Sequence, residues 1–292
     1  MKNWVISGKT RVCGVIGDPV EHTMSPVMHN AAFQKTGLDY VYVAFRVKKE
    51  ELGEAIHGMR ALGIRGLNVT IPHKVEVMQF IDELDGLAEK IGAVNTISND
   101  NGVLKGYNTD ATGFLQALLE KGVEPKGKRV VILGAGGASR GISFILADRG
   151  AELSILNRLQ ELDWAKELSK HISQTFGKEV GALELNRENL KKVLGKADIL
   201  VNATSVGMSP NINETAVEPD LLRPGLVVFD IVYNPIKTRL LMEAEAAGAR
   251  TIGGLDMLVW QGALAFEKWT GQKAPVELMR NEAIKLLTGH EK

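Results

Sequence analysis

The chain has 292 residues, of which 45% are hydrophobic and 24% are charged, a composition typical of a globular protein with room for two domains of about 150 residues. Lysine plus arginine equal aspartate plus glutamate at 35 each, so no bulk charge draws the chain to nucleic acid or membrane. No stretch approaches the ~20 apolar residues of a membrane span, and the amino terminus lacks the apolar core of a signal peptide. The single cysteine, Cys13, lies in an apolar run and fits a buried thiol in a reducing compartment. We therefore expect a cytoplasmic protein without nucleic-acid or membrane partners.

The first part of the chain alternates predicted strands and helices. Apolar and β-branched runs predict strands at residues 11–17, 40–47 and 66–70, and a hairpin at 91–97 and 102–106. Helices are predicted from Pro26, over residues 50–62, where apolar residues recur at helical spacing, and from Lys74. This alternation indicates an α/β domain.

Two hydroxyls precede the helix that begins near Pro26. Ser25 stands where a helix cap is expected, and capping alone would explain it. Thr23 and Ser25 are also spaced so that both can point into a cleft at a helix amino terminus, which suits an anion such as a carboxylate. The neighbouring His22 and His29 lack the spacing of a metal site, and we interpret them as structural.

A lysine follows two polar residues across a tight turn. Asn68 and Thr70 end the third strand, and Lys74 comes after the turn at residues 71–72. An isolated lysine is usually a solvated surface charge, but this one is placed so that it can converge with the polar pair. Asn95, in the hairpin, is a polar residue whose role nothing local decides.

Residues 106–114 pack a carboxylate, an amide and two hydroxyls just before a predicted helix. Asn108 or Thr109 is suited to cap that helix and would place Asp110 in its first turn, so that capping alone would explain all three residues. Asp110 also lies between the lysine-bearing loop and a glycine-rich turn. That position favours a residue that faces a substrate on one side and a nucleotide on the other.

The second part of the chain contains a strand, turn, helix, strand unit. Residues 128–133 and 152–156 predict the strands, and the glycine-rich turn spans residues 134–139. The glycines stand where a dinucleotide pyrophosphate needs bare backbone and helix amides. A glycine pattern alone is weak, but between a strand and a helix it is strong.

The end of the second strand of this unit indicates the cofactor. An NAD-binding unit usually has an acidic residue about 20 positions after the glycines, where it holds the ribose hydroxyls. Here the strand ends in Asn157 and Arg158. Arg158 can pair with a 2′-phosphate, so the sequence favours NADP over NAD.

Further strands are predicted at residues 198–201 and 227–230 of a parallel sheet. Polar loops follow both strands at their carboxyl ends, where ligands bind in such folds. A helix is predicted from residue 253, and Gln261, the least expected residue on its largely apolar surface, is interpreted as pointing into a cleft. A last helix is predicted over residues 275–287.

Motifs along the whole chain resemble those of the shikimate/quinate dehydrogenase family. They are SPxxHN at Ser25, NVTIPHK at Asn68, GAVNT at Gly92, NTDxxG at Asn108, GAGGA at Gly134, NATSxGM at Asn202 and the helix with Gln261. The resemblance implies two α/β domains with a cleft between them. Residues 1–107 would form a substrate domain, completed by the C-terminal helices over 255–292, and residues 108–254 a Rossmann-type NADP domain.

The resemblance also implies a reaction and its residues. The reaction would be the NADP-dependent, reversible reduction of 3-dehydroshikimate to shikimate by hydride transfer, without a metal, with Lys74 and Asp110 as the catalytic pair. Which of the two accepts the proton stays open. Thr23 and Ser25 would hold the substrate carboxylate, and the ring hydroxyls would contact Asn68, Thr70, Asn95, Asp110, Tyr233 and Gln261. The cofactor would be lined by Gly134, Gly136, Gly137, Ala138, Asn157, Arg158, Thr204, Met208 and Gly254.

Two departures from the family pattern qualify these expectations. The family usually has serine where Thr23 stands, and the extra methyl changes the fit around the carboxylate. It often has a second basic residue soon after the arginine, whereas this chain continues Leu159-Gln160-Glu161-Leu162. A clamp of one arginine holds a 2′-phosphate less firmly, so the first alternative is a quinate/shikimate dehydrogenase that uses NAD or both cofactors. A more distant alternative, independent of the clamp, is a non-catalytic dinucleotide-binding regulator. We expect a monomer or a homodimer.

Overall fold

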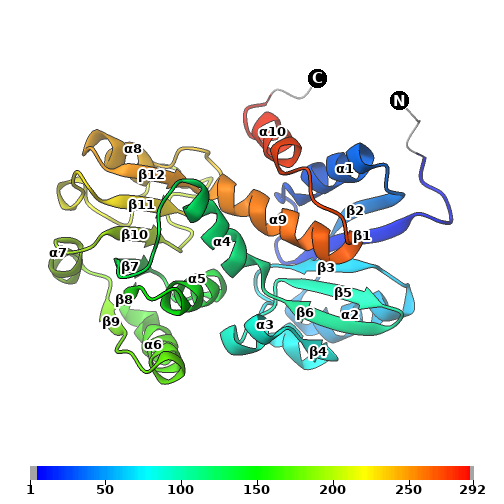
Figure 1. Cartoon of the computed structure of the whole chain (residues 1–292), viewed down its shortest axis with the longest axis horizontal. Coiled ribbons are helices and arrows are strands. Elements are labelled where there is room, and N and C mark those ends of the chain that lie inside the picture. Colours follow the sequence, from blue (N-terminus) through cyan, green and yellow to red (C-terminus); the bar gives the residue numbers. More distant parts are fainter. Residues whose placement is uncertain (1–4, 290–292) are drawn as a thin grey trace. The chain divides into compact units, whose positions relative to one another are not determined.

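The computed structural model describes residues 5–289 and divides the chain into two compact units (Figure 1). Unit 1 contains the chain up to Gly113 and again from Val259, and unit 2 contains Phe114–Leu258. Both divisions fall inside helices, α4 (Thr109–Glu120) and α9 (Gly254–Thr270). The sequence prediction placed the domain limits at residues 107 and 254, at the starts of these helices. In the structure the first turn of α4 belongs to unit 1 and the first turn of α9 belongs to unit 2.

Unit 1 is built on a mixed sheet of six strands in the order β2-β1-β3-β5-β6-β4. The strands are β1 (Arg11–Gly17), β2 (Tyr40–Arg46), β3 (Gly66–Val69), β4 (Glu83–Leu84), β5 (Thr96–Asp100) and β6 (Val103–Tyr107). β1 pairs in parallel with β2 and β3, whereas β5 is antiparallel to both β3 and β6. The predicted hairpin is confirmed as β5–β6, and its turn places Asn101 and Gly102 at positive φ, 55° and 93°.

The helices of unit 1 correct two sequence predictions. They are α1 (Ser25–Thr36), α2 (Leu52–Ala61), α3 (Gly86–Ile91), α10 (Val276–Leu287) and the 3-10 turns η1 (Lys49–Glu51) and η2 (Glu76–Phe80). The helix predicted from Lys74 is wrong, because only η2 forms there and Lys74 stays in the preceding turn. The strand predicted from residue 91 is also wrong at its start. Asp85 caps α3 through the amides of Leu87 and Ala88, and the helix continues until Gly92 ends it in the left-handed region.

One face of the unit 1 sheet carries a buried group of aromatic rings. The rings are His29, Phe33, Tyr42, Phe266 and Trp269, from α1, β2 and α9. Trp269 donates from Nε1 to the carbonyl of Ile97 at 2.9 Å, and a Cβ at Gly66 would lie 2.1 Å from that nitrogen. Glycine at position 66 therefore lets α9 lie close to the sheet.

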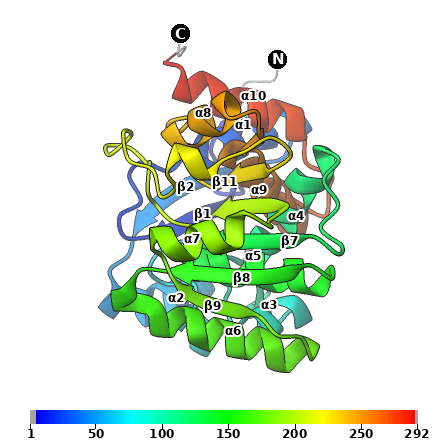
Figure 2. The ribbon, with the colours of Figure 1, turned by 90° about the vertical axis from the view of Figure 1, so that its left-hand side faces the viewer.

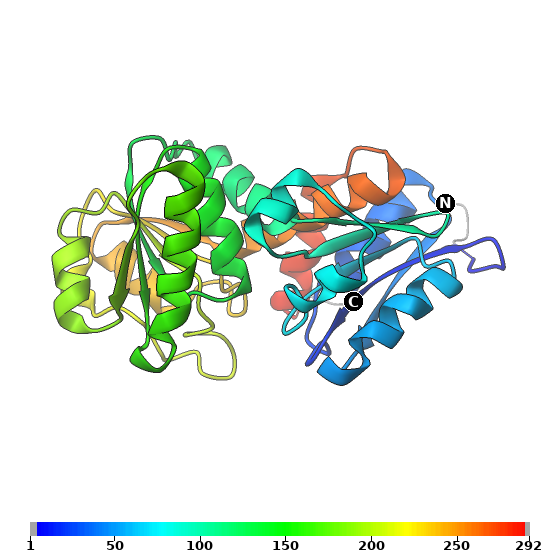
Figure 3. The same cartoon turned by 90° about the horizontal axis from the view of Figure 1, so that it is seen from below.

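Unit 2 is a parallel sheet of six strands in the order β12-β11-β10-β7-β8-β9. The strands are β7 (Arg129–Leu133), β8 (Glu152–Asn157), β9 (Gly181–Glu184), β10 (Ile199–Asn202), β11 (Val227–Asp230) and β12 (Arg250–Gly253). Figure 2 shows β7, β8 and β9 side by side, and helices lie on both faces of the sheet (Figure 3). Read from β9, the order is the doubly wound order of a dinucleotide-binding fold. The predicted fold class, two α/β domains of which one is Rossmann-type, is confirmed.

The helices of unit 2 cover an aliphatic core. They are α5 (Gly137–Asp148), α6 (Leu162–Phe176), α7 (Arg187–Leu194), α8 (Arg239–Ala246) and the 3-10 turns η3 (Leu159–Glu161) and η4 (Pro219–Leu221). Leu133, Leu156, Leu200 and Val228 of the strands pack there with leucines of α7 and α8. Among the helices of residues 5–289, none has the length and apolar character needed to cross a membrane.

His29 makes the stability of unit 1 depend on pH. Its ring is fully buried and stacks on Tyr42 with centroids 4.4 Å apart, and burial lowers its pKa from 6.5 to about 3. The unfolded chain therefore binds a proton at this residue between those values, and the folded chain does not. The contribution of the neutral His29 to the free energy of unfolding is complete above pH 6.5. It is lost as the pH falls, by about 1.4 kcal/mol per pH unit below 6.

We expect His29→Leu to remove this dependence. The measurement is the free energy of unfolding from urea titrations of both proteins between pH 7 and pH 4. The difference between wild type and variant should shift in favour of the variant as the pH falls, and two parallel curves would contradict the assignment.

Candidate active site

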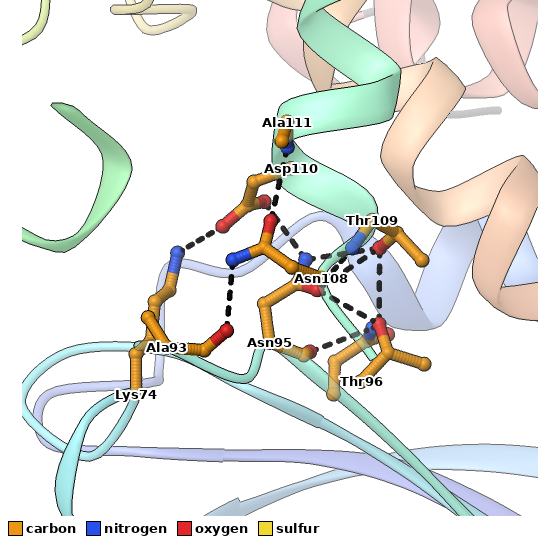
Figure 4. A network of polar contacts seen from close by, with 9 residues as sticks. Lys74, Ala93, Asn95, Thr96, Asn108, Thr109, Asp110 and Ala111 are labelled. Atoms are coloured by element: carbon orange, nitrogen blue, oxygen red, sulfur yellow. Dashed lines mark hydrogen bonds and ion pairs between the residues drawn. The ribbon is translucent and has the colours of Figure 1, made fainter. Parts of the chain in front are cut away.

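Lys74 and Asp110 form a half-buried ion pair in unit 1. Lys74 Nζ lies 2.5 Å from Asp110 Oδ2, with the two side chains 15% and 9% exposed (Figure 4). The reading of Lys74 as a solvated surface charge is therefore wrong. At this exposure water screens the pair much less than it screens a surface pair.

Asn108 fixes the start of the helix that carries Asp110. Its Oδ1 accepts from the backbone amide of Ala111 at 3.0 Å, which confirms Asn108 as the cap of α4. Its Nδ2 donates to the carbonyl of Ala93 at 3.0 Å and ties the helix start to the loop before β5. Asp110 lies in the first turn as predicted, but its carboxylate does not cap the helix and is directed to Lys74 instead.

Asn95 holds the other oxygen of the Asp110 carboxylate. Asn95 Oδ1 accepts from the backbone amide of Thr109 at 2.6 Å, and because an amide N–H only donates, this bond fixes which way the side chain faces. Asn95 Nδ2 then donates to Asp110 Oδ1 at 2.8 Å and to Thr109 Oγ1 at 3.0 Å (Figure 4). Asn95, whose role the sequence left open, is a buried amide that orients Asp110.

The loops that carry the pair are tied together by backbone bonds. The amide of Val94 donates to the carbonyl of Lys74 at 2.8 Å, and the amide of Val69 donates to that of Asn95 at 2.8 Å. The turn after β3 is therefore fixed against the segment that precedes β5. This places the lysine opposite the helix start that the sequence separates from it by more than thirty residues.

Ser25 does not cap α1. It is already the first residue of the helix, with Pro26 behind it, and no side chain caps the helix start at Met24. Ser25 Oγ instead accepts from Thr23 Oγ1 at 3.3 Å. The capping prediction is therefore wrong, and the two hydroxyls lie together at a helix amino terminus.

The other site residues predicted for unit 1 lie beside the same elements. Asn68 is buried in β3, and Thr70 follows it, half-buried, with its methyl group against Gly17. Gln261 is 9% exposed, and its backbone packs on Gly113, where an added Cβ would lie 2.7 Å from its amide nitrogen. Because Gly113 is one turn after Asp110, α9 contacts α4 directly behind the ion pair.

In unit 2 the glycine turn joins β7 to α5 in the expected way. Gly134 has φ +97°, and a Cβ there would lie 2.9 Å from Thr204 Cγ2. Ser139 Oγ donates to the Gly134 carbonyl at 2.7 Å and closes the turn. No side chain caps the start of α5, whose first turn holds Gly137 and Ala138, and a Cβ on Gly136 would meet no atom within 4 Å. The turn therefore leaves the helix amides bare and open in front.

The end of β8 carries a charge pair that the sequence did not predict. Asn157 Nδ2 donates to the carbonyl of Glu161 at 2.9 Å, which folds η3 back toward the strand. The Arg158 guanidinium forms an ion pair with the Glu161 carboxylate and holds the pKa of that carboxyl below its usual value. β8 does not end in an acidic residue, but Glu161 in the following turn η3 places a carboxylate there.

A second polar network at the carboxyl ends of β10 and β11 escaped the sequence analysis. Asn202 Nδ2 donates to Asp230 Oδ1 at 2.9 Å, and Asn202 Oδ1 accepts from Thr204 Oγ1 at 2.6 Å. Thr238 Oγ1 donates to Asp230 Oδ2 at 2.6 Å, and burial raises the pKa of Asp230 to about 6. The signal that could have found the pair is that both residues end neighbouring strands of one parallel sheet.

The remaining residues predicted in unit 2 differ in their surroundings. Met208 is 45% exposed, whereas Tyr233 is half-buried and burial raises its pKa. A Cβ at Gly254 would lie 2.1 Å from the carbonyl oxygen of Ile231. Gly254 therefore has a packing reason of its own, because it lets α9 begin against the loop after β11.

Fold and site together define a two-unit α/β protein with a doubly wound sheet, a bare glycine turn and a half-buried lysine–aspartate pair. Three family models match the chain: the shikimate dehydrogenase substrate binding domain over residues 15–97, shikimate/quinate 5-dehydrogenase over 117–239 and the shikimate 5′-dehydrogenase C-terminal domain over 254–284. The chain belongs to the shikimate/quinate dehydrogenase family.

Individual relatives match over nearly the whole chain. The shikimate dehydrogenase (NADP+) of Methanopyrus kandleri is 51% identical over 97% of this chain and 98% of its own. A crystal structure of a shikimate dehydrogenase with NADP+ superposes with a TM-score of 0.92 at 47% identity, covering 97% of this chain and 98% of that one. The Listeria monocytogenes shikimate 5-dehydrogenase, in complex with shikimate and NAD, gives 0.87 at 43% identity, covering 94% and 97%.

The two glycines of the turn offer a matched pair of variants. Gly134→Ala forces a side chain into the left-handed region and against Thr204, so we expect a loss of about 1–3 kcal/mol in the free energy of unfolding. Gly136→Ala is the control, because its φ is −78° and the added Cβ is in open space. It should change stability by less than about 0.5 kcal/mol. Equal effects in urea unfolding would contradict the geometry of the turn.

Proposed function

We propose that the protein is an NADP-dependent shikimate dehydrogenase that reversibly reduces 3-dehydroshikimate to shikimate. The observation that carries the proposal is the ion pair of Lys74 and Asp110, 2.5 Å apart, in a chain of this family. Both carboxylate oxygens of Asp110 accept a hydrogen bond, one from Lys74 and one from Asn95. A lysine held in this way can deliver a proton at a defined place.

The substrate would be held by its carboxylate and its ring hydroxyls. Thr23 and Ser25 supply two hydroxyls at the amino terminus of α1, where helix amides favour an anion. The ring hydroxyls would contact Asn68, Thr70, Asn95, Asp110, Tyr233 and Gln261. All of these except Tyr233 belong to unit 1, which supports that unit as the substrate domain and unit 2 as the nucleotide domain.

Proton transfer is assigned to Lys74. In the reduction, its ammonium donates a proton to the carbonyl oxygen of the substrate as the carbon of that carbonyl is reduced. In the reverse direction the neutral amine accepts the hydroxyl proton. Asp110 orients Lys74 and balances its charge, because both of its oxygens already accept hydrogen bonds within the protein.

The residues of unit 2 fit a dinucleotide. The start of α5 leaves uncapped amides in front of the open space at Gly136, a cradle for a pyrophosphate. Asn157 and Arg158 end the strand where the adenosine ribose would lie, with Thr204, Met208 and Gly254 on the neighbouring loops. The nicotinamide of NADP supplies or accepts the hydride when the cofactor is bound.

The pairing of Arg158 with Glu161 favours a second candidate function, that of a quinate/shikimate dehydrogenase that also uses NAD. An arginine engaged by a carboxylate has less to offer a 2′-phosphate. The deciding experiment is a steady-state assay of shikimate and quinate, each with NADP and NAD. A high kcat/KM for shikimate with NADP supports the proposal, and turnover with neither acid would overturn it.

The setting that we propose for this enzyme is the cytoplasm, as a monomer or homodimer. Cys13 is a buried, unpaired thiol in β1, and burial raises its pKa. Such a thiol is inert toward oxidation and fits a reducing compartment.

Removing either member of the catalytic pair should stop turnover without unfolding the protein. Lys74→Ala and Asp110→Ala are each expected to lower kcat by about 10²–10⁴-fold, the usual contribution of general acid–base catalysis. The matched control is Lys105→Ala, which breaks an exposed pair with Glu83 in the same unit, 3.2 Å long. Near-normal turnover in either site variant, with folding checked by circular dichroism, would refute the role of the pair.

Arg158 and Glu161 should act in opposite directions on cofactor choice. Arg158→Ala is expected to lower the ratio of kcat/KM for NADP over NAD by about tenfold, the low end for a hydrogen bond to a charged group, because the side chain is exposed. Glu161→Gln should raise the ratio, because it releases the guanidinium and removes a negative charge. Lys166→Ala is the control, since it breaks a more exposed pair with Asp163 in the first turn of α6. Ratios that stay constant in both variants, at one ionic strength, would place the phosphate elsewhere.

A further inference from the structure

We propose that Tyr42 is a positioning residue of the substrate site, whose hydroxyl holds the side-chain oxygen of Asn68. The inference rests on the proposed function, because Ser25 and Asn68 are assigned there to the substrate. Tyr42 lies in β2, is 1% exposed and donates from its hydroxyl to Asn68 Oδ1 at 2.7 Å. The family motifs quoted above do not include it.

Residues of the SPxxHN motif contact Tyr42 through its backbone and its ring. Asn30 Oδ1 accepts from the Tyr42 amide at 2.8 Å, and Asn30 Nδ2 donates to its carbonyl at 2.9 Å. The His29 ring stacks on the Tyr42 ring, with centroids 4.4 Å apart and an angle of 6° between the planes. Burial raises the pKa of the Tyr42 phenol, and the nearby Ser25 side chain opposes that shift. Two residues of the motif therefore hold the backbone and the ring of Tyr42, and a third lies near its hydroxyl.

Tyr42, together with Thr96 and Asn95, limits what Asn68 presents to a ligand. Asn68 Nδ2 donates one hydrogen to Thr96 Oγ1 at 3.0 Å and the other to the carbonyl of Asn95 at 3.3 Å. The tyrosine hydroxyl occupies one lone pair of Oδ1, so that within residues 5–289 one acceptor site on this amide is left for a ligand. Asn68 can therefore accept from a substrate hydroxyl but cannot donate to one.

The same contacts connect the carboxylate end of the site to the catalytic end. Thr96 Oγ1, which accepts from Asn68, shares a hydrogen bond with Thr109 Oγ1 at 3.0 Å, next to Asn95 (Figure 4). A buried series of hydrogen bonds thus runs from Tyr42 through Asn68 and Thr96 toward the amide that holds Asp110. Tyr42 is the member that joins α1 to β3, and so it fixes the spacing between the two groups proposed to hold the substrate.

The test is Tyr42→Phe, which removes one oxygen and keeps the stacked ring. Without the donor, Asn68 Oδ1 is buried and unpaired, and the side chain is held only through its amino group, by the carbonyl of Asn95 and by Thr96. We expect the KM for shikimate to rise about 3- to 10-fold, the effect of one lost hydrogen bond, with kcat and the KM for NADP within about twofold of wild type. Tyr40→Phe is the matched control on the same strand face, because its hydroxyl accepts from Arg11 at 3.3 Å instead.

A second readout follows Asn68 without substrate. The side-chain amide resonances of Asn68, assigned with Asn68→Asp, should shift in Tyr42→Phe and stay in place in Tyr40→Phe. A shift confined to Tyr42→Phe together with a selective rise in the KM for shikimate supports the proposal. An unchanged amide signal, or equal changes in the two variants, would overturn it. Lack of shikimate turnover in the wild type would instead refute the proposed function, and the amide signal would still decide whether Tyr42 orients Asn68.

Discussion

The bond from the Thr109 amide to Asn95 Oδ1, 2.6 Å long, is the constraint on which the site depends. A backbone N–H has no other role than donor, so this bond decides that the Asn95 amino group faces the Asp110 carboxylate. The carboxylate then offers its second oxygen to Lys74. A lysine, a helix start and a hairpin strand are thereby brought to one point, although no two of them are neighbours in sequence. Reversing this one amide would set oxygen against carboxylate and separate the pair.

Unit 1 carries an unusual amount of buried polar chemistry beside its aromatic core. Asn68, Asn95, Thr96 and Thr109 are each at most 5% exposed, and each makes hydrogen bonds to at least one of the others. A buried polar group costs several kcal/mol when it is unpaired and little when it is satisfied, so such a network is stable only when it is complete. We infer that the rigidity of the site comes from this requirement. The stacked rings of His29 and Tyr42, both buried, lie next to this network.

Much of the fold could be predicted because its signals are local. The strands of unit 2 and the glycine turn at Gly134 follow from apolar runs and backbone freedom within a few residues. The errors have one cause, which is that a tertiary contact or cap outweighed local preference. Ser25 reads as a cap, yet its hydroxyl lies with Thr23, and α3 extends into a predicted strand because Asp85 caps it. The roles of Asn95 and Tyr42 could not be read at all, because they consist of bonds to residues distant in sequence.

The role that we propose for Arg158 would make cofactor choice depend on the short turn at the end of β8. Asn157 fixes the turn through the Glu161 carbonyl, and so the acid faces Arg158 without any contribution from the rest of the unit. A 2′-phosphate that binds Arg158 must displace this carboxylate or tolerate it, whereas a free ribose hydroxyl has no such competitor and can donate to the same acid. Among the matched structures one contains NADP+ and another contains NAD with shikimate. An exposed ion pair contributes less than about 1 kcal/mol, so Glu161 competes only weakly with a 2′-phosphate for Arg158. One substitution in this turn would then be enough to change the preference between NADP and NAD.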